Sequence, residues 1–482
     1  MGENLRQKTL GALIWNLLDR TGQQVLTLVV TIIVANILQV EDYALTGMLV
    51  FFTALANLII DSGFSAALIQ RKTIEEKDLS SVFFLNLTIS VAIYLILVIC
   101  TPLIAGFFDE PRLRQIAPVV FLAIPLNALS LVQGVLLNRQ VNFKPLFKAD
   151  VTASFVSGLI AVVLAVLGYG VWALVLQSVS LAFVRTIFLW INSSWRPIRS
   201  FDFKRIKDLS SFAMSLLAAG LLNTLFLNVY NVIIGKLFPA RQLGYFTQSG
   251  KFCDPVVTLI YASIQNATYP VLSQMQDEGE RLLEAYRKSI QLTAMLAFPM
   301  MVGLMITAKP LIQLLLKDDW WPAIPYLRWL CIGGIFTILT AINNNFIKVS
   351  GETHGVLLVE IWKVLALIMG IMMSWQYGVM AMVATFAAVR IVVYLINLLY
   401  TQGCTSYEFL QQLWDILPFL LLSAVMGAAI YPLEWLISNN LLLIISEVIL
   451  GMAIYIIGLS IFSKTLFREC IQLLKMRFSK NK

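Results

Sequence analysis

Charged side chains stand inside long apolar stretches of this chain, where few sequence neighbours could balance them. The basic residues in such positions are Arg20, Arg185, Lys251, Lys363 and Arg390, and the acidic ones are Asp19, Asp61, Asp254 and Glu360. Groups of these types can form ion pairs, bind a proton or a cation, or hold an anion. Arginine suits the last task, because its fixed fork of donors matches phosphate oxygens.

Four apolar stretches also carry polar residues three, four or seven apart, a spacing that places each set on one helix face. The sets are Asn16, Asp19, Arg20, Gln23, Gln24, Thr27 and Thr31; Thr46, Thr53, Asn57, Asp61 and Ser65; Gly220, Thr224, Asn228, Asn231 and Gly235; and Thr247, Lys251, Asp254, Thr258, Tyr261 and Gln265. They could hydrogen-bond between helices or line a water-filled cavity. We favour the cavity, because the sets lie on corresponding helices of the two halves of the chain.

Some charges have an opposite charge at helical spacing. Lys251 precedes Asp254 by three residues, and Glu360 precedes Lys363 by three. Residues three apart are neighbours on a helix surface, so each set is expected to form an ion pair on one helix.

Arg185 and Arg390 have no such neighbour and occupy matching places in the two halves, so we expect them to hold an anionic substrate group. The alternative for each is a structural salt bridge within its own half. Asp61 is a candidate proton or cation site, or else a hydrogen-bonded buried acid or an ion-pair partner for Arg20. The full candidate set is Arg20, Arg185, Arg390, Lys251, Lys363, Asn57, Asn228, Asn231 and Gln265 for substrate binding, and Asp19, Asp61, Asp254 and Glu360 for ion coupling.

Signatures of enzyme catalysis are missing from the sequence. No HExxH, GxxxxGK, GxSxG or GxGxxG motif occurs, and the one histidine, His354, is expected in a turn. The five cysteines are scattered without a CxxC pair, so they suit neither a metal site nor a disulfide framework. We therefore expect no enzyme, metal or cofactor, with H+ or Na+ as candidate coupling ions.

The candidate residues belong to a chain of 482 residues that is 59% hydrophobic and 13% charged, with a mean hydropathy of +0.82. Soluble domains carry about 25% charged residues. The apolar stretches are long enough to cross about 30 Å of hydrocarbon as helices. The sequence predicts an all-α polytopic membrane protein with about 14 transmembrane helices, at residues 10–38, 43–70, 79–106, 115–137, 150–168, 171–193, 208–238, 243–270, 286–316, 324–349, 355–375, 378–400, 415–437 and 440–463.

Lysine and arginine, which give the chain its net charge of +8, gather in alternate loops and in both tails. The loops predicted on the other side of the membrane contain only four basic residues, Arg112, Arg114, Arg241 and Lys317. Because loops rich in lysine and arginine stay in the cytoplasm, both termini are expected there. The charge therefore sets orientation and does not indicate a nucleic-acid partner.

A repeat divides the chain into two halves. Residues 169–175 (YGVWALV) match residues 377–383 (YGVMAMV) at five of seven positions, and both fall between the fifth and sixth spans of their half. Six spans return the chain to the same side, so we expect two copies related by a pseudo-twofold axis along the membrane normal. The predicted domains are a six-helix lobe at 1–194, a basic cytoplasmic linker at 195–207, a second six-helix lobe at 208–402, two further helices at 403–464 and a basic cytoplasmic tail at 465–482.

Three local strings carry a resemblance to a known family. They are ANILQVEDY at 35–43, DSGFSAALIQ at 61–70, and the Tyr-Gly-Val turns beginning at Tyr169 and Tyr377. Together with the twelve-plus-two layout, they make the chain similar to the polysaccharide transport family of the multidrug/oligosaccharidyl-lipid/polysaccharide exporter superfamily. Within that family it most resembles bacterial flippases for capsule, exopolysaccharide or O-antigen repeat units, of the colanic-acid type.

The resemblance implies a bacterial inner-membrane flippase with two lobes that alternate between inward- and outward-open forms. Its cargo would be a polyprenyl-pyrophosphate-linked oligosaccharide, moved to the outer leaflet for surface polysaccharide synthesis. The expected partners are this lipid-linked substrate, membrane lipids and other polysaccharide assembly proteins, and the expected oligomeric state is a monomer. Two alternatives remain open: a cation-coupled multidrug antiporter of the same superfamily, and a membrane-bound polysaccharide polymerase or ligase.

Overall fold

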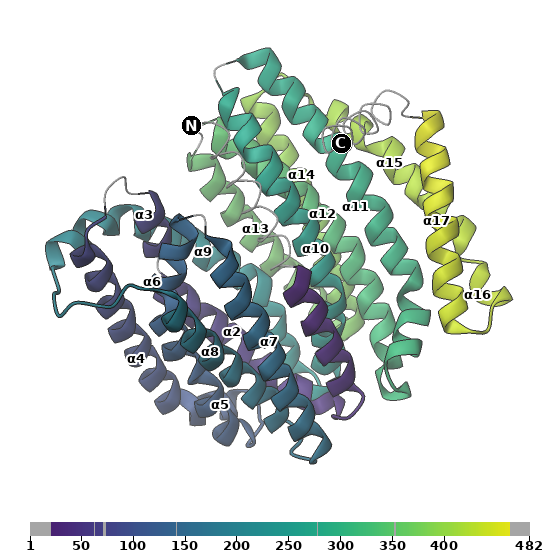
Figure 1. Ribbon diagram of the computed structural model, residues 1–482. Coiled ribbons are helices and arrows are strands. Elements are labelled where there is room, and N and C mark those ends of the chain that lie inside the picture. Colours follow the sequence, from purple (N-terminus) through teal and green to yellow (C-terminus); the bar gives the residue numbers. More distant parts are fainter. Residues whose placement is uncertain are drawn as a thin grey trace, which may run out of the picture. The chain divides into compact units, whose positions relative to one another are not determined.

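The computed structural model describes residues 21–61, 63–70, 74–140, 142–276, 278–350 and 353–462, and within these ranges the chain is helical with no strand (Figure 1). The helices are Thr21–Ala35, α2 (Val40–Asp61), α3 (Phe64–Gln70), α4 (Glu76–Phe107), α5 (Leu113–Phe121), α6 (Ala123–Arg139), α7 (Phe143–Val166), α8 (Trp172–Asn192), α9 (Phe203–Leu237), α10 (Ala240–Gln274), α11 (Gly279–Leu315), η1 (Asp318–Ala323), α12 (Ile324–Val349), α13 (Thr353–Ser374), η2 (Trp375–Tyr377), α14 (Val379–Cys404), α15 (Phe409–Ile430), α16 (Leu433–Leu436) and α17 (Asn440–Phe462). An all-helical fold is what the sequence predicts.

Every predicted span coincides with a helix or a helix pair in the described part of the chain, and 12 helical segments there are long and apolar enough to cross a membrane. Two of the fourteen predicted spans are not among these 12 segments, each for a simple reason. The first span is described only from Thr21, as a shorter apolar helix. Helix α10 carries the polar set ending at Gln265, which lowers its hydropathy.

Three predicted spans are each split in two. The span predicted at 415–437 is divided between α15 and α16, and the span predicted at 43–70 is interrupted at Gly63, where φ is +71°, before α3 begins. The span predicted at 115–137 is broken at Leu122, between α5 and α6. Pro125 explains the break at Leu122, because proline has no N–H to donate to the carbonyl of Phe121.

The two Tyr-Gly-Val turns share a backbone feature that only glycine adopts readily. Gly170 has φ +56° and Gly378 has φ +90°, so both glycines lie in the left-handed region. Each turn leads directly into a long helix, α8 in one half and α14 in the other. The backbone thus repeats the sequence match between the two halves.

The chain forms two compact units, the first ending at Lys251 and the second beginning at Phe252. In the first unit α7 packs against α8, α6 packs against α4 and α8, and α2 packs against α9. Helix α9 and the start of α10 therefore belong with the helices of residues 1–194 by contact. The six-plus-six division stays a prediction.

In the second unit α12 packs against α11 and α14, and α13 packs against α14. The two helices after the predicted twelve, α15 and α17, pack against α11 and each other and are drawn in yellow-green and yellow in Figure 1. Polar contacts hold them there: Tyr455 donates to the carbonyl of Met295 at 2.9 Å, and Arg287 pairs with Asp415 at 2.5 Å. The outward side of α17 exposes apolar residues such as Ile449, 61% exposed, as lipid contact requires.

Candidate functional site

A cluster of charged side chains lies in the second unit, on three helices. It comprises Asp254 on α10, Glu360 and Lys363 on α13, and Arg390 on α14. Lys363 Nζ donates to Glu360 Oε2 at 3.0 Å, which confirms the ion pair predicted from their spacing. Arg390 is near enough for its charge to act on both Asp254 and Lys363. The fold thus brings together four candidate residues far apart in the sequence.

Helix α10 presents a polar face next to this cluster. Asp254, Thr258 and Tyr261 are exposed, whereas Val257 and Ile260, which lie to one side of them around the helix, are buried. An interhelical hydrogen-bonding role would bury the polar residues, yet these three remain accessible. A charged carboxylate on a membrane-embedded helix cannot face the hydrocarbon of the lipid without a large cost in free energy. The arrangement therefore favours a water-filled space beside α10.

The side chain of Arg390 is buried and closely packed. It is only 9% exposed, and its guanidinium carbon lies 4.3 Å from the centroid of the Phe386 ring. Gly333 on α12 makes room for its stem, since a Cβ there would stand 2.8 Å from Arg390 Cδ. Packing and a cation–π contact fix where the positive charge sits.

Lys251 does not form the predicted pair with Asp254 in the described part of the chain. Its ammonium lies 4.3 Å from the ring centroid of Tyr43 instead. The spacing of three residues permits the pair, but the aromatic face of a neighbouring helix provides another partner. Lys251 is therefore a cation held by a ring in the first unit.

Arg185 is engaged by a carboxylate of the neighbouring helix. Its Nε donates to Asp150 Oδ1 at 2.5 Å, joining α8 to α7. The Asp150 side chain is 12% exposed and that of Arg185 is 37% exposed. This geometry corresponds to the alternative of a salt bridge within its own half, and it leaves Arg185 less available to an anion than its sequence position suggested.

The other candidates of the first unit are more dispersed. Asn57 Oδ1 accepts a bond from Asn127 Nδ2 at 3.3 Å, joining α2 to α6. Asp61 Oδ1 is buried and has no hydrogen-bond partner among the described residues. Asn228 donates to the carbonyl of Thr224 at 3.0 Å, and Asn231 is half-buried.

Gly220 and Gly235 of the α9 set pack against α2, where an added Cβ would contact Leu58 or Met48. They therefore serve close helix packing. Gln265 on α10 is half-buried, with its Oε1 lacking a partner among the described residues. Asp19 and Arg20 lie outside the described residues.

Comparison with known proteins decides the family. A model of the polysaccharide biosynthesis protein family matches residues 33–325, more than half of the chain. The chain belongs to this family. Its relatives include the teichuronic acid biosynthesis protein TuaB of Bacillus subtilis, 25% identical over 395 residues that cover 75% of this chain and 80% of the relative.

Two further relatives are a succinoglycan transport protein and a lipopolysaccharide protein. The succinoglycan biosynthesis transport protein ExoT of Rhizobium meliloti is 28% identical over 324 residues, which make up 67% of this chain and 66% of the relative. The lipopolysaccharide biosynthesis protein WzxC of Escherichia coli is 21% identical over 433 residues, which make up 87% of this chain and 86% of the relative.

Solved structures show the same fold. The lipid II flippase MurJ in an inward closed conformation aligns with a TM-score of 0.77 and 17% identity, over 95% of this chain and 99% of MurJ. An inward-facing multidrug transporter of the MOP superfamily aligns with a TM-score of 0.64 and 16% identity, over 82% and 94%. This member of the polysaccharide biosynthesis family therefore has the fold of MOP-superfamily transporters and is a multi-pass membrane protein.

In this family member, sequence reasoning missed a small, partly open pocket of about 190 Å³ between helix Thr21–Ala35, α7 and α8. It is lined by Thr27, Val30, Ser154, Ser157, Leu174, Gln177, Ser178 and Leu181. Ser154 and Ser157 are three apart, and Gln177 and Ser178 are adjacent, so a weak helical pattern was present. Such serines usually bond their own backbone, as Ser157 does to the carbonyl of Ser154 at 3.2 Å.

The sequence also did not reveal how firmly the basic linker is held. Arg205 bonds Asp78 at 2.9 Å, Glu75 at 2.8 Å and Asp202 at 3.3 Å, and the first two contacts raise its pKa above the ordinary value. The backbone N–H groups of Ile198 and Asp202 donate to hydroxyls at the start of α4, each at 3.0 Å. The linker is thus a strap fixed to α4.

Proposed function

We propose that this protein is a flippase that moves a polyprenyl-pyrophosphate-linked oligosaccharide repeat unit from the cytoplasmic to the outer leaflet of the bacterial inner membrane. Its membership of the polysaccharide biosynthesis family carries the proposal. The relatives named for succinoglycan and lipopolysaccharide synthesis, and the fold shared with a lipid II flippase, point the same way. The repeat unit would serve a surface polysaccharide.

The physical task explains why a polar path is needed. A pyrophosphate and several sugars cannot enter about 30 Å of hydrocarbon without losing their hydration, which is prohibitive for charged groups. The exposed polar face of α10, with Asp254, Thr258 and Tyr261, would replace part of that water. The polyprenyl tail would stay in the bilayer.

We assign contact with the pyrophosphate to Arg390. Packing against Gly333 and Phe386 fixes its guanidinium, whose charge reaches Asp254 on α10. Arg185 is the weaker candidate, because Asp150 already occupies its Nε. Lys363 would add positive charge next to Arg390, although Glu360 partly neutralises it.

Asp254 is the best-placed ion-coupling group. It is exposed and lies within electrostatic reach of Arg390. A proton or Na+ on Asp254 would cancel its attraction for Arg390 and so strengthen the attraction of the guanidinium for the substrate phosphate. Ion binding and substrate binding would then favour each other, because coupling between two sites is reciprocal.

The proposal is tested in the bacterium by removing the gene and restoring it as wild type or as Arg390→Ala. Loss should abolish the surface polysaccharide and leave lipid-linked repeat units on the cytoplasmic leaflet, and Arg390→Ala should not restore export. Resistance to dyes and cationic antibiotics should be unchanged. Normal polysaccharide with lost drug resistance would instead identify a cation-coupled multidrug antiporter.

A further inference from the structure

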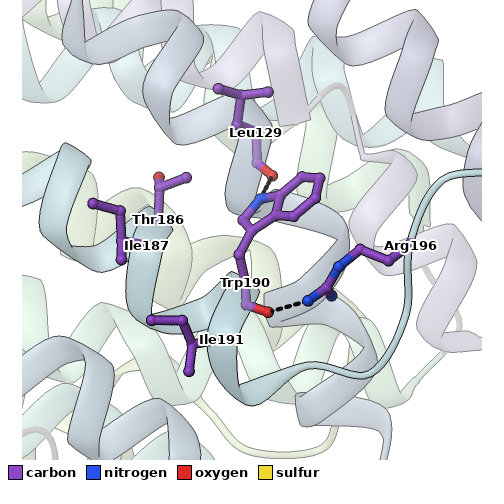
Figure 2. A pocket seen from close by; sticks show the side chains of 6 residues that line it. All are labelled: Leu129, Thr186, Ile187, Trp190, Ile191 and Arg196. Atoms are coloured by element: carbon purple, nitrogen blue, oxygen red, sulfur yellow. Dashed lines mark hydrogen bonds between the residues drawn. The ribbon is translucent and has the colours of Figure 1, made fainter.

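A groove of about 310 Å³ opens on the first unit near the end of α8 (Figure 2). It is lined by Leu129, Thr186, Ile187, Trp190, Ile191 and Arg196. Ile191 is 70% exposed and Ile187 is 39% exposed, although both belong to a membrane-crossing helix. Exposed isoleucines on such a helix face acyl chains, so the groove opens toward lipid.

Arg196 stands at the polar end of this groove in a fixed position. Its Nη1 donates to the carbonyls of Ser193 at 2.6 Å and Trp195 at 2.7 Å, and its Nη2 donates to that of Trp190 at 2.8 Å. Its guanidinium also lies 5.3 Å from the Trp190 ring centroid. A guanidinium has five N–H groups, so two of them have no acceptor among the described residues.

The charge of Arg196 is not neutralised by protein. No carboxylate of the described chain lies within ion-pair distance of it, whereas Arg205 in the same linker contacts three. Backbone carbonyls orient a guanidinium without cancelling its positive charge. An arginine fixed in this way at the edge of a lipid-facing groove is complementary to an anionic headgroup.

We propose that this groove binds an anionic phospholipid of the surrounding leaflet. The phosphate would take the two remaining N–H groups of Arg196, and one acyl chain would lie along Ile187, Ile191 and Leu129. Trp190 would stand at the headgroup level, where tryptophan is enriched in membrane proteins. The site is separate from the charged cluster, and the inference does not depend on the transported substrate.

The lining favours a phospholipid over the sugar-bearing lipid. Besides Arg196, the polar side-chain groups of the groove are the Thr186 hydroxyl and the Trp190 indole N–H, which already donate to the carbonyls of Leu126 and Leu129, each at 2.8 Å. No amide or carboxylate of the groove could bind sugars, and no second cation is present there for a pyrophosphate. One phosphate charge and an acyl chain match what the groove offers.

The test is native mass spectrometry of the purified full-length protein with phosphatidylglycerol or phosphatidylethanolamine added. The wild type should hold one phosphatidylglycerol more tightly than phosphatidylethanolamine, and Arg196→Gln should weaken that binding about tenfold, as loss of a charge-assisted contact predicts. Arg199→Gln is the matched control, because it removes an exposed arginine of the same linker outside the groove. It should bind like the wild type.

A second variant separates lipid binding from the role of Arg196 at the end of α8. Ile187→Trp should fill the apolar part of the groove while leaving the contacts of Arg196 intact, and it should weaken phosphatidylglycerol binding at an unchanged Tm. The proposal is overturned if both lipids bind equally, or if Ile187→Trp binds phosphatidylglycerol as the wild type does. Displacement of phosphatidylglycerol by equimolar polyprenyl phosphate would also overturn it, since the groove would then be a substrate site.

Discussion

Arg390 on α14 and Gly333 on α12 meet so closely that a single added methyl would displace one of them. The Cβ of an alanine at position 333 would stand 2.8 Å from Arg390 Cδ and 3.3 Å from the backbone of Ala387. The position of the arginine is therefore set by the absence of a side chain on the facing helix. This contact joins the packing of α12 and α14 to the charge that we assign to substrate binding.

Replacing Gly333 by alanine should lower polysaccharide export by shifting the guanidinium of Arg390. Overpacking of this kind costs roughly 1–3 kcal/mol, so the variant should reach the membrane but export poorly. Gly303→Ala on α11 is the control, because nothing lies within 4 Å of its added Cβ. Equal export by the two variants would show that the position of Arg390 is unimportant.

The open face of α10 should react with water-borne reagents. In a cysteine-free background, Thr258→Cys should be labelled by a membrane-impermeant thiol reagent in everted or right-side-out vesicles, because Thr258 is exposed. Val257→Cys, one residue earlier and 9% exposed, should resist. Labelling is read from a mass shift of the purified protein. If Thr258→Cys stays unlabelled in both vesicle types, α10 does not border water.

The ion pair between Arg185 and Asp150 should contribute to stability rather than to substrate contact. Arg185→Ala alone leaves the mostly buried Asp150 carboxylate unbalanced and should lower the free energy of unfolding by roughly 1 kcal/mol. Adding Asp150→Ala should restore much of the Tm and normal export. If the double variant folds well but exports nothing, Arg185 holds the substrate after all.

Asp254 should couple transport to an ion gradient. Asp254→Asn keeps the size of the side chain but removes its charge and its ability to bind a proton or Na+. In proteoliposomes, translocation by this variant should be insensitive to imposed pH and Na+ gradients that accelerate the wild type. Glu360→Gln should keep the response, since Glu360 is bound to Lys363 at 3.0 Å. A full response in Asp254→Asn would remove Asp254 from the coupling mechanism.

The sequence was most informative where a pattern repeats along one helix. Long apolar runs predicted the helices, and the spacing of Glu360 and Lys363 predicted their ion pair. It was least informative where the partner comes from another helix. Lys251 lies over Tyr43 rather than beside Asp254, and Asp150 pairs with Arg185. Such partners depend on which helix faces pack together, and charge spacing within one helix does not contain that information.

The linker shows the same limit. Its basic residues predicted a wet cytoplasmic connection, but two carboxylates, Glu75 and Asp78, and two serine hydroxyls bind the segment to the start of α4. Ser80 and Ser81 are fully buried under it. Their part in holding the linker could not be read from a predicted membrane span.

Transport itself is tested most directly by translocation of a fluorescent polyprenyl-pyrophosphate-linked oligosaccharide in proteoliposomes. Access of an added, membrane-impermeant glycosidase to the oligosaccharide would be measured over time. Wild-type protein should move the lipid between leaflets well above the rate in protein-free liposomes, and Arg390→Ala should reduce that rate at least tenfold. A wild-type rate equal to that of empty liposomes, under every imposed ion gradient, would contradict the flippase function.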